Sequence, residues 1–171
     1  MKNLVLDFGN VIGFFDHGRA IAKLAPFTDL PPVELALHLY GSPIEDAYER
    51  GAIPTAEYVR LAKLNGRLTC PDDVFLAAFV DIFWANDEVC DLIPRLAGNC
   101  RLFLASNTNV AHQSQFAGQF AAVLAPFVHL CTSFTAAARK PEPAFFDHCQ
   151  RVIGGDARDC VFVDDLPANV E

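Results

Sequence analysis

The chain has 171 residues and a formal net charge of −8, with 52% hydrophobic and 20% charged residues. This length predicts one domain, or one domain with a small insert, and this apolar content predicts a substantial core rather than disorder. The acidic balance argues against a general polyanion-binding face, so we expect no nucleic-acid partner. No apolar stretch approaches the length of a membrane span, so we expect no membrane partner.

The cysteines and histidines indicate neither a disulfide framework nor a histidine metal site. Six cysteines lie far apart without a C-x-x-C pair, and the five histidines show no H-E-x-x-H pattern. Asp7 interrupts the apolar N-terminus before it could act as a secretory segment. Free thiols in a reducing compartment follow, so we expect a cytoplasmic protein.

The first half of the chain changes from one strand to a long helical stretch. Residues 3–7 have the pattern of a buried strand. From about residue 15 to 97 apolar residues recur at three- and four-residue spacing, with Pro, Gly and Asp between the helical segments. The pattern predicts helices over 17–25, 32–40, 55–65 and 71–84, and a further helical run over 87–96.

The second half alternates strands and helices. The pattern predicts strand 101–105, helix 109–120, a short strand over 129–133, helix 141–153 and strand 160–163. Such alternation is typical of an α/β protein with a three-layer, Rossmann-like parallel sheet. We expect the first strand, the strand before Ser106 and the strand before Asp164 to be central neighbours.

The long helical stretch is too large for one crossover between neighbouring strands. It therefore predicts an inserted helical cap that lies over the carboxyl edge of the sheet. The expected division is a catalytic core of residues 1–14 and 98–171 and a cap of residues 15–97.

Polar residues follow the apolar runs at three points and precede a helix at a fourth. Because loops at the carboxyl ends of parallel strands build one site, we expect these residues to converge. Carboxylates, a hydroxyl and an ammonium are the groups needed for metal-assisted phosphoryl transfer through a covalent aspartyl intermediate. The residues are Asp7, Ser106, Asn107, Lys140, Asp164 and Asp165.

In this order and context, the segments resemble the haloacid dehalogenase (HAD) superfamily, most of whose members are phosphatases. Their form is most similar to the bacterial sugar-phosphate (glucose-1-phosphate) phosphatase branch, which carries a helical C1 cap. The matching segments are Asp7-Phe8-Gly9-Asn10-Val11, Ser106-Asn107-Thr108-Asn109, Arg139-Lys140-Pro141 and Val163-Asp164-Asp165. The chain stops at Asn169-Val170-Glu171, where relatives continue through a helix and a further strand, so we expect a truncated C-terminal end of the core.

The resemblance implies a role for each site residue. It makes Asp7 the nucleophile and a ligand of Mg²⁺, with the Gly9 carbonyl, Asp164 and Asp165 as the other ligands. It makes Ser106, Asn107 and Lys140 the phosphate-binding residues, with Asp7, Ser106 and Lys140 as the catalytic set. The residues alone leave a structural alternative open: the paired acids and the Ser-Asn-Thr-Asn segment can simply cap helices.

One position departs from the family pattern. Most phosphatases of this superfamily carry an acid two residues after the nucleophile, and Gly9 stands there. General acid–base assistance typically contributes about 10²–10⁴-fold. Asp16 and His17 are candidate proton donors. Candidate specificity residues in the cap are Tyr48, Glu49, Arg50 and Trp84.

These features predict a Mg²⁺-dependent phosphatase that acts on a small phosphorylated metabolite, with a sugar phosphate as the first candidate. One alternative is a non-catalytic protein that binds a phosphometabolite. Another is a 2-haloacid dehalogenase, which needs no metal and lacks the paired acids. The substrate and the oligomeric state stay open at this stage.

Overall fold

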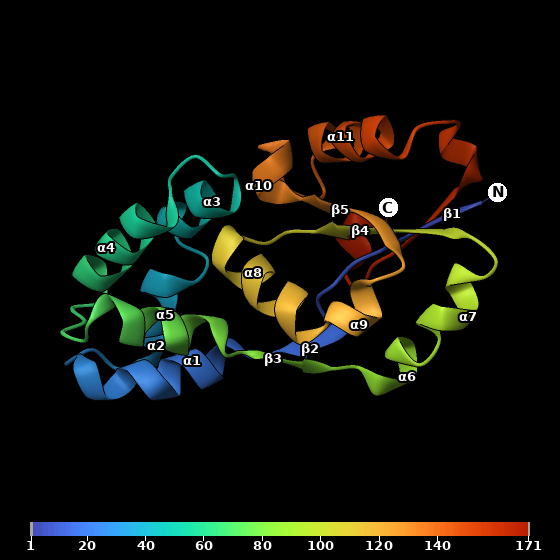
Figure 1. The fold of residues 1–171 in the computed structure, drawn as a ribbon. Coiled ribbons are helices and arrows are strands. Elements are labelled where there is room, and N and C mark those ends of the chain that lie inside the picture. Colours follow the sequence, from blue (N-terminus) through green and yellow to red (C-terminus); the bar gives the residue numbers. More distant parts are fainter. Residues whose placement is uncertain (1, 171) are drawn as a thin grey trace.

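The computed structural model describes residues 2–170 and shows an α/β fold built on a four-stranded parallel sheet (Figure 1). The strand order is β5-β4-β1-β6, and all three pairings are parallel. The strands are β1 (Asn3–Leu6), β4 (Arg101–Ser106), β5 (Phe127–Thr132) and β6 (Cys160–Val163). The expected α/β class and parallel sheet are confirmed.

Helices cover both faces of the sheet, because successive side chains of a strand point to opposite faces. Leu102 and Leu104 pack with α7 (Ile93–Ala97), α8 (Val110–Gln119) and α9 (Ala121–Leu124). Val5 and Phe103 pack on the other face with Phe145, from the helix pair α10 (Ser133–Ala136) and α11 (Pro143–Ile153). The result is the three-layer arrangement predicted from the sequence.

A separate helical unit lies beside the carboxyl edge of the sheet, at the left of Figure 1. It has its own apolar core, in which Tyr48, Tyr58, Phe75 and Phe79 are fully buried. The unit comprises α1 (His17–Leu24), the 3₁₀ turn η1 (Ala25–Phe27), α2 (Pro32–Leu39), α3 (Pro43–Glu49), α4 (Thr55–Asn65) and α5 (Asp72–Val80).

A two-stranded antiparallel ribbon joins the helical unit to the sheet. It consists of β2 (Gly13–Phe15) and β3 (Phe83–Ala85). The predicted helix over 71–84 is therefore wrong at its end, since α5 stops at Val80 and residues 83–85 pair with β2. This pairing joins residues about seventy positions apart, so local helical periodicity does not reveal it. Gly13 is required here, because a Cβ would lie 2.7 Å from the Phe8 ring.

The segment after the ribbon packs with the sheet rather than with the helical unit. Ile93, in α7, belongs to the apolar cluster around Leu102, and Val89, in α6 (Asp87–Cys90), packs against it. These contacts favour a cap that ends near Ile82. The division into residues 15–97 and the remainder stays a prediction.

β6 occupies a different place from the one expected. Among residues 2–170 it pairs with β1 alone, so it is an edge strand rather than a central one. Val161 and Val163 are accordingly half exposed. Two 3₁₀ turns flank this strand, η2 (Ala157–Asp159) and η3 (Pro167–Asn169).

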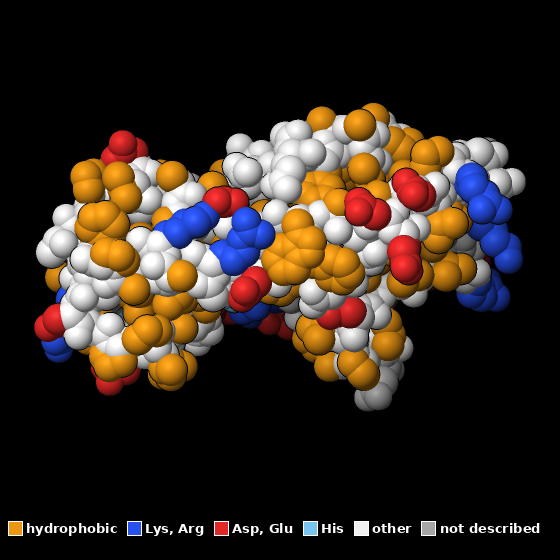
Figure 2. All heavy atoms as spheres, turned by 90° about the horizontal axis from the view of Figure 1, so that it is seen from below, with side chains coloured by type: hydrophobic (Ala, Val, Ile, Leu, Met, Phe, Trp, Pro, Cys, Tyr) orange, Lys and Arg blue, Asp and Glu red, His pale blue; other side chains and the backbone are white. Residues whose placement is uncertain are grey.

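Figure 2 shows the face that lies at the bottom of Figure 1, with the helical unit on the left and the sheet unit on the right. Apolar side chains are dispersed over this face among acidic side chains, and Lys and Arg side chains gather at separate places. Within the described part of the chain, none of the helices combines the length and the apolar character of a membrane span.

An aromatic cluster ties the loop after β1 to the helices beneath the sheet. The Phe8 ring stacks on Phe116 at 3.9 Å and meets Phe83 and Phe120 edge-on. We expect Phe116→Ala to lower the free energy of unfolding by about 3–5 kcal/mol, because it removes a fully buried ring from this cluster. Denaturant unfolding measures the change.

The matched control is Val33→Ala on α2, where the side chain is 73% exposed. We expect the free energy of unfolding of this variant to stay within about 0.5 kcal/mol of the wild type. Equal effects of the two substitutions would contradict the cluster's role.

Candidate active site

The Lys140 ammonium lies at the centre of the site and is almost completely buried. Its Nζ is 2.9 Å from Asp7 Oδ1 and 2.6 Å from Asp164 Oδ2, and it donates to the Ala105 carbonyl at 2.8 Å. Asp7 follows β1, Asp164 follows β6 and Ala105 lies in β4. One cation therefore joins the ends of three strands, and all three of its N–H donors are engaged.

The two carboxylates beside Lys140 differ in their environments. Burial raises the pKa of Asp7 to about 6, although attraction and a hydrogen bond from Lys140 oppose the rise. Burial also acts on Asp164, but hydrogen bonds from Lys140, the Leu166 amide and Asn169 hold its pKa below the ordinary value. Asp7 Oδ2 accepts no hydrogen bond within residues 2–170, whereas both oxygens of Asp164 do.

Three carboxylates form a group that suits a hard divalent cation. Single oxygens of Asp7, Asp164 and Asp165 all lie within 4.8 Å of one another. Asn10, which has a left-handed φ of 54°, donates from Nδ2 to Asp165 Oδ2 at 2.9 Å. Oxygen ligands are those that Mg²⁺ prefers, and a cation would offset the repulsion among the carboxylates. The donor set therefore fits Mg²⁺, and Gly9 lines the same cavity.

The segment after β4 contributes one hydroxyl and one positioning amide. Ser106 is buried and lines the cavity. The Asn107 amide is occupied by the Lys140 backbone: Oδ1 accepts from the Lys140 amide at 2.8 Å, and Nδ2 donates to its carbonyl at 3.0 Å. The side chain of Asn107 thus fixes Lys140, while Asn109 caps α8 by accepting from the His112 amide.

A cavity of about 530 Å³ lies between the sheet edge and the helical unit. The predicted residues Asp7, Gly9, Ser106, Asn107, Lys140 and Asp165 all line it. Asp164 lies directly behind, bound to Lys140. The wall formed by the helical unit includes His17, Tyr40, Gly41, Glu45 and Glu49.

Of the four candidate specificity residues in the cap, Glu49 lines this cavity. Tyr48 is buried in the core of the helical unit, where its hydroxyl lies 2.8 Å from Thr55 Oγ1 and accepts from the Ala111 amide. Trp84 is 41% exposed on β3, and Arg50 binds Glu142.

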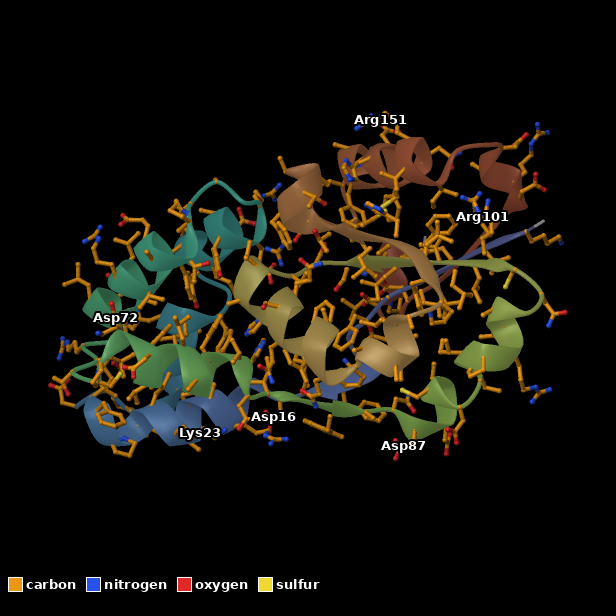
Figure 3. The ribbon with its side chains drawn as sticks, in the orientation of Figure 1. Asp16, Lys23, Asp72, Asp87, Arg101 and Arg151 are labelled. Carbon is orange, nitrogen blue, oxygen red and sulfur yellow. The ribbon has the colours of Figure 1, made fainter. Side chains whose placement is uncertain are left out.

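Asp16 and His17 occupy different environments. Asp16 caps α1 by accepting from the Gly18 amide at 2.7 Å, and Figure 3 labels it at the start of that helix. His17 lines the cavity and stacks on Tyr40 at 3.7 Å. Burial lowers the pKa of His17 to about 4 despite the charge of Asp16, so its ring is neutral near pH 7.

An aromatic ring occupies the space beside Gly9. A Cβ at this position would lie 2.9 Å from Cε1 of Phe15, on β2. The missing acid is therefore matched by a bulky neighbour, and an added side chain must displace that ring. Phe15 is 36% exposed, so its ring has solvent beside it into which it can move.

Ion pairs connect the helical unit to the loop that carries Lys140. Arg139 pairs with Asp46 and with Glu49, each at 2.9 Å. Arg50 binds both carboxylate oxygens of Glu142, at 2.9 and 2.5 Å. The residues on both sides of the Lys140-Pro141 step are thus tied to α3.

Several residues of the site were missed by sequence reasoning. Asn10 adjoins the first motif and could have been identified from the sequence. An Asn beside a nucleophile loop offers both a left-handed conformation and a side-chain amide. Asn169, Phe15, Tyr40 and Glu45 come from distant elements, and no local pattern marks them. Their roles follow from tertiary contacts alone.

Glu45 is the buried acid in the wall formed by the helical unit. It accepts a hydrogen bond from the Gly41 amide. Burial raises its pKa from 4.5 to about 7, and nearby Glu49 and Asp46 add to the rise, whereas the Gly41 hydrogen bond and Arg139 oppose it. Between these two pH values the folded protein holds a proton that the unfolded chain releases. Stability from this group therefore falls as pH rises through that window.

We expect Glu45→Gln to remove this pH-dependent cost. The difference in Tm between the variant and the wild type should shift in favour of the variant between pH 5 and pH 8, as thermal unfolding will measure. Glu34→Gln, on the exposed surface of α2, is the control and should show no such shift. An unchanged difference in Glu45→Gln would contradict the assigned burial.

No protein-family model matches the chain. Several solved structures match it in fold. A HAD family enzyme of Bacteroides thetaiotaomicron, BT-2542, is 24% identical with a TM-score of 0.84, over 99% of this chain and 86% of that one. Its complex with magnesium and inorganic phosphate matches at 22% identity and a TM-score of 0.83, over 99% and 87%. A predicted HAD-like family hydrolase of Porphyromonas gingivalis matches at 21% identity and 0.83, over 99% and 84%. The chain therefore has the fold of HAD family enzymes.

Proposed function

We propose that this chain is a HAD hydrolase, a Mg²⁺-dependent phosphatase that cleaves a small phosphorylated metabolite through an aspartyl-phosphate intermediate. The observation that carries the proposal is the convergence of three carboxylates, a buried lysine and a serine on one cavity. The structure of BT-2542 with magnesium and inorganic phosphate supports it, since that enzyme shares the fold.

Asp7 is the proposed nucleophile because one of its oxygens is fixed and the other is free. Oδ1 accepts from the Phe8 amide at 2.7 Å and faces Lys140, which leaves Oδ2 available to the phosphorus atom. Attack forms the Asp7–phosphorus bond and breaks the ester bond, and the leaving oxygen takes a proton. Water then attacks phosphorus, which releases phosphate and restores the carboxylate.

The proposed Mg²⁺ ligands are Asp7, the Gly9 carbonyl, Asp164 and Asp165. When bound there, the cation neutralises the phosphate charge that otherwise repels the nucleophile. Asn10 holds Asp165 in place at 2.9 Å.

Lys140 and the segment after β4 form the proposed phosphate-binding side. Ser106 and Asn107 line the cavity at a strand-to-helix turn, where a hydroxyl and a backbone amide suit an anion. Because Asp7, Asp164 and Ala105 already engage the three donors of Lys140, the lysine reaches phosphate only by sharing the proton that faces Asp7. Its main contribution is charge, placed where the phosphoryl group transfers.

A sugar phosphate is the first candidate substrate. The cavity of about 530 Å³ admits a small ligand, and its wall formed by the helical unit offers polar side chains rather than a purely apolar surface. The sequence resemblance to the sugar-phosphate branch points to the same class.

The two alternatives are weaker. A 2-haloacid dehalogenase of Pseudomonas syringae shares the fold with a lower TM-score of 0.58 and 19% identity. The three clustered carboxylates offer a cation site, which halide displacement does not require. A non-catalytic binding protein would keep the phosphate site without turnover, so an activity assay separates it.

We expect Asp7→Asn to abolish Mg²⁺-dependent hydrolysis of p-nitrophenyl phosphate, because an amide is not a nucleophile here. The loss should be at least about 10³-fold in kcat, given what covalent nucleophiles contribute. Stopped absorbance assays with and without a chelator measure it, and circular dichroism checks the fold.

The control is Asp87→Asn, which removes one exposed acid from α6, labelled in Figure 3. It should keep wild-type turnover. Turnover in Asp7→Asn close to the wild type, or wild-type activity that survives the chelator, would remove the proposed mechanism.

The glycine at position 9 leads to a second prediction. Without an acid there, kcat should depend steeply on the pKa of the leaving group, so aryl phosphates should be cleaved much faster than alkyl phosphates. The double variant Gly9→Asp/Phe15→Ala should flatten this dependence, since it adds the acid and removes the obstructing ring. A rate series over substituted phenyl and alkyl phosphates measures the slope.

Phe15→Ala alone is the control and should keep the steep slope. A shallow slope in the wild type would show that another group already supplies the proton. His17 is the candidate for that group within the cavity.

A further inference from the structure

The wall that the helical unit contributes to the cavity is rich in hydrogen-bond acceptors. Glu45 and Glu49 come from α3, and both are more than nine-tenths buried. One oxygen of Glu45 accepts from the Gly41 amide, and within residues 2–170 the other has no hydrogen-bond partner. A ligand that donates to this second oxygen therefore adds a hydrogen bond that the protein itself does not supply.

Tyr40 adds a second polar atom without a partner. Its hydroxyl is buried and forms no hydrogen bond among residues 2–170, although the ring lines the cavity. The ring is held between His17, at 3.7 Å, and Phe79, at 5.8 Å. Stacking thus fixes the position of this hydroxyl beside the cavity.

The charges of the cavity disfavour a second anion on the substrate. Four carboxylates line it, from Asp7, Glu45, Glu49 and Asp165, against two cations, Arg139 and Lys140. Both cations already face two carboxylates each. A divalent cation and a dianionic phosphate cancel one another, and Arg139 pairs with Glu49. Glu45, which forms no ion pair within residues 2–170, is then the one uncompensated carboxylate at the distal end.

At the cavity end formed by the helical unit, neutral substrate groups are favoured over a positively charged one. Arg139 lies 2.9 Å from Glu49, which compensates that carboxylate. Burial raises the pKa of Glu45 to about 7, so its charge is partial near neutral pH. His17 and His112 are uncharged, because burial lowers the pKa of His17 to about 4 and that of His112 to about 3.

We propose that Glu45, with Tyr40 and Glu49, determines substrate specificity by binding hydroxyl donors on an uncharged substrate body and rejecting substrates that carry a second anionic group. The sugar phosphates of the proposed function are thereby limited to those whose body carries no second anionic group. This inference rests on the proposed function, because it concerns the leaving group of the same reaction.

The test uses three hexose-derived esters of similar size. Glucose 6-phosphate has a neutral body, 6-phosphogluconate adds a carboxylate, and glucosamine 6-phosphate adds an ammonium. We expect kcat/KM for glucose 6-phosphate to exceed that for 6-phosphogluconate by about tenfold or more, the size of a partly screened like-charge contact. Glu45→Gln should reduce this ratio at least about threefold, because it removes the charge and keeps the shape.

Glu34→Gln on α2 is the matched control and should keep the wild-type ratio. Glu49→Gln provides a second variant in case Glu45→Gln does not fold, as judged by circular dichroism. Equal rates for glucose 6-phosphate and 6-phosphogluconate, or an unchanged ratio in both cavity variants, would overturn the inference. If glucosamine 6-phosphate turned over faster than glucose 6-phosphate, the preferred substrate body would be cationic. That result would overturn the inference as well.

Calorimetry distinguishes failure of the proposed function from failure of the specificity inference. If none of the three esters is hydrolysed, the same esters are titrated into the Mg²⁺-loaded wild type, where the ratio of their affinities reports selectivity. Selective binding without hydrolysis would remove the phosphatase proposal and support the specificity residues. Absence of binding by all three esters would overturn both.

Discussion

The contact on which this site depends is the burial of one ammonium among three strand ends. Lys140 is held by Asp7 after β1, Asp164 after β6 and the Ala105 carbonyl of β4. Carboxylates so close together repel one another, and a buried cation without partners is equally costly. Each group therefore requires the others, and the arrangement is stable only as a set. This mutual dependence places the Asp7 carboxylate at a defined point of the sheet edge.

The backbone around the lysine is held as firmly as its side chain. Asn107 forms two hydrogen bonds with the backbone of Lys140, and Arg139 and Glu142 on either side pair with residues of α3. Contacts with the cap and the position of the ammonium are thus parts of one network. Movement of α3 away from the sheet would break these ion pairs before it disturbed the charges at the nucleophile.

The cavity divides into two chemical halves. At the sheet edge, charged groups are paired and suited to a cation and a phosphoryl group. At the wall of the helical unit, stacked rings and buried carboxylates leave a few polar atoms without partners. The first half has the groups that general phosphoryl-transfer chemistry requires, whereas the second half has groups suited to contacts with the rest of a substrate. Selectivity in the proposed reaction is expected from the second half.

The sequence by itself determined which polar residues meet at the sheet edge. The strands before Asp7, Ser106 and Asp164 were predictable because short apolar runs bounded by polar residues favour parallel strands, and their carboxyl ends must meet. The helical character of most of residues 17–80 was predictable from its periodicity. The reason is local: each of these features depends on neighbours within a few positions.

Tertiary structure alone decided the rest. The β2–β3 ribbon joins segments about seventy residues apart, so residues 83–84 follow a strand partner instead of their helical periodicity. The Asn107 side chain turns to the Lys140 backbone, and Phe15 fills the space beside Gly9. Glu45 and Tyr40 become cavity residues only because the helical unit lies beside the sheet edge. Such contacts depend on how distant elements pack, and no local pattern of residue types encodes that packing.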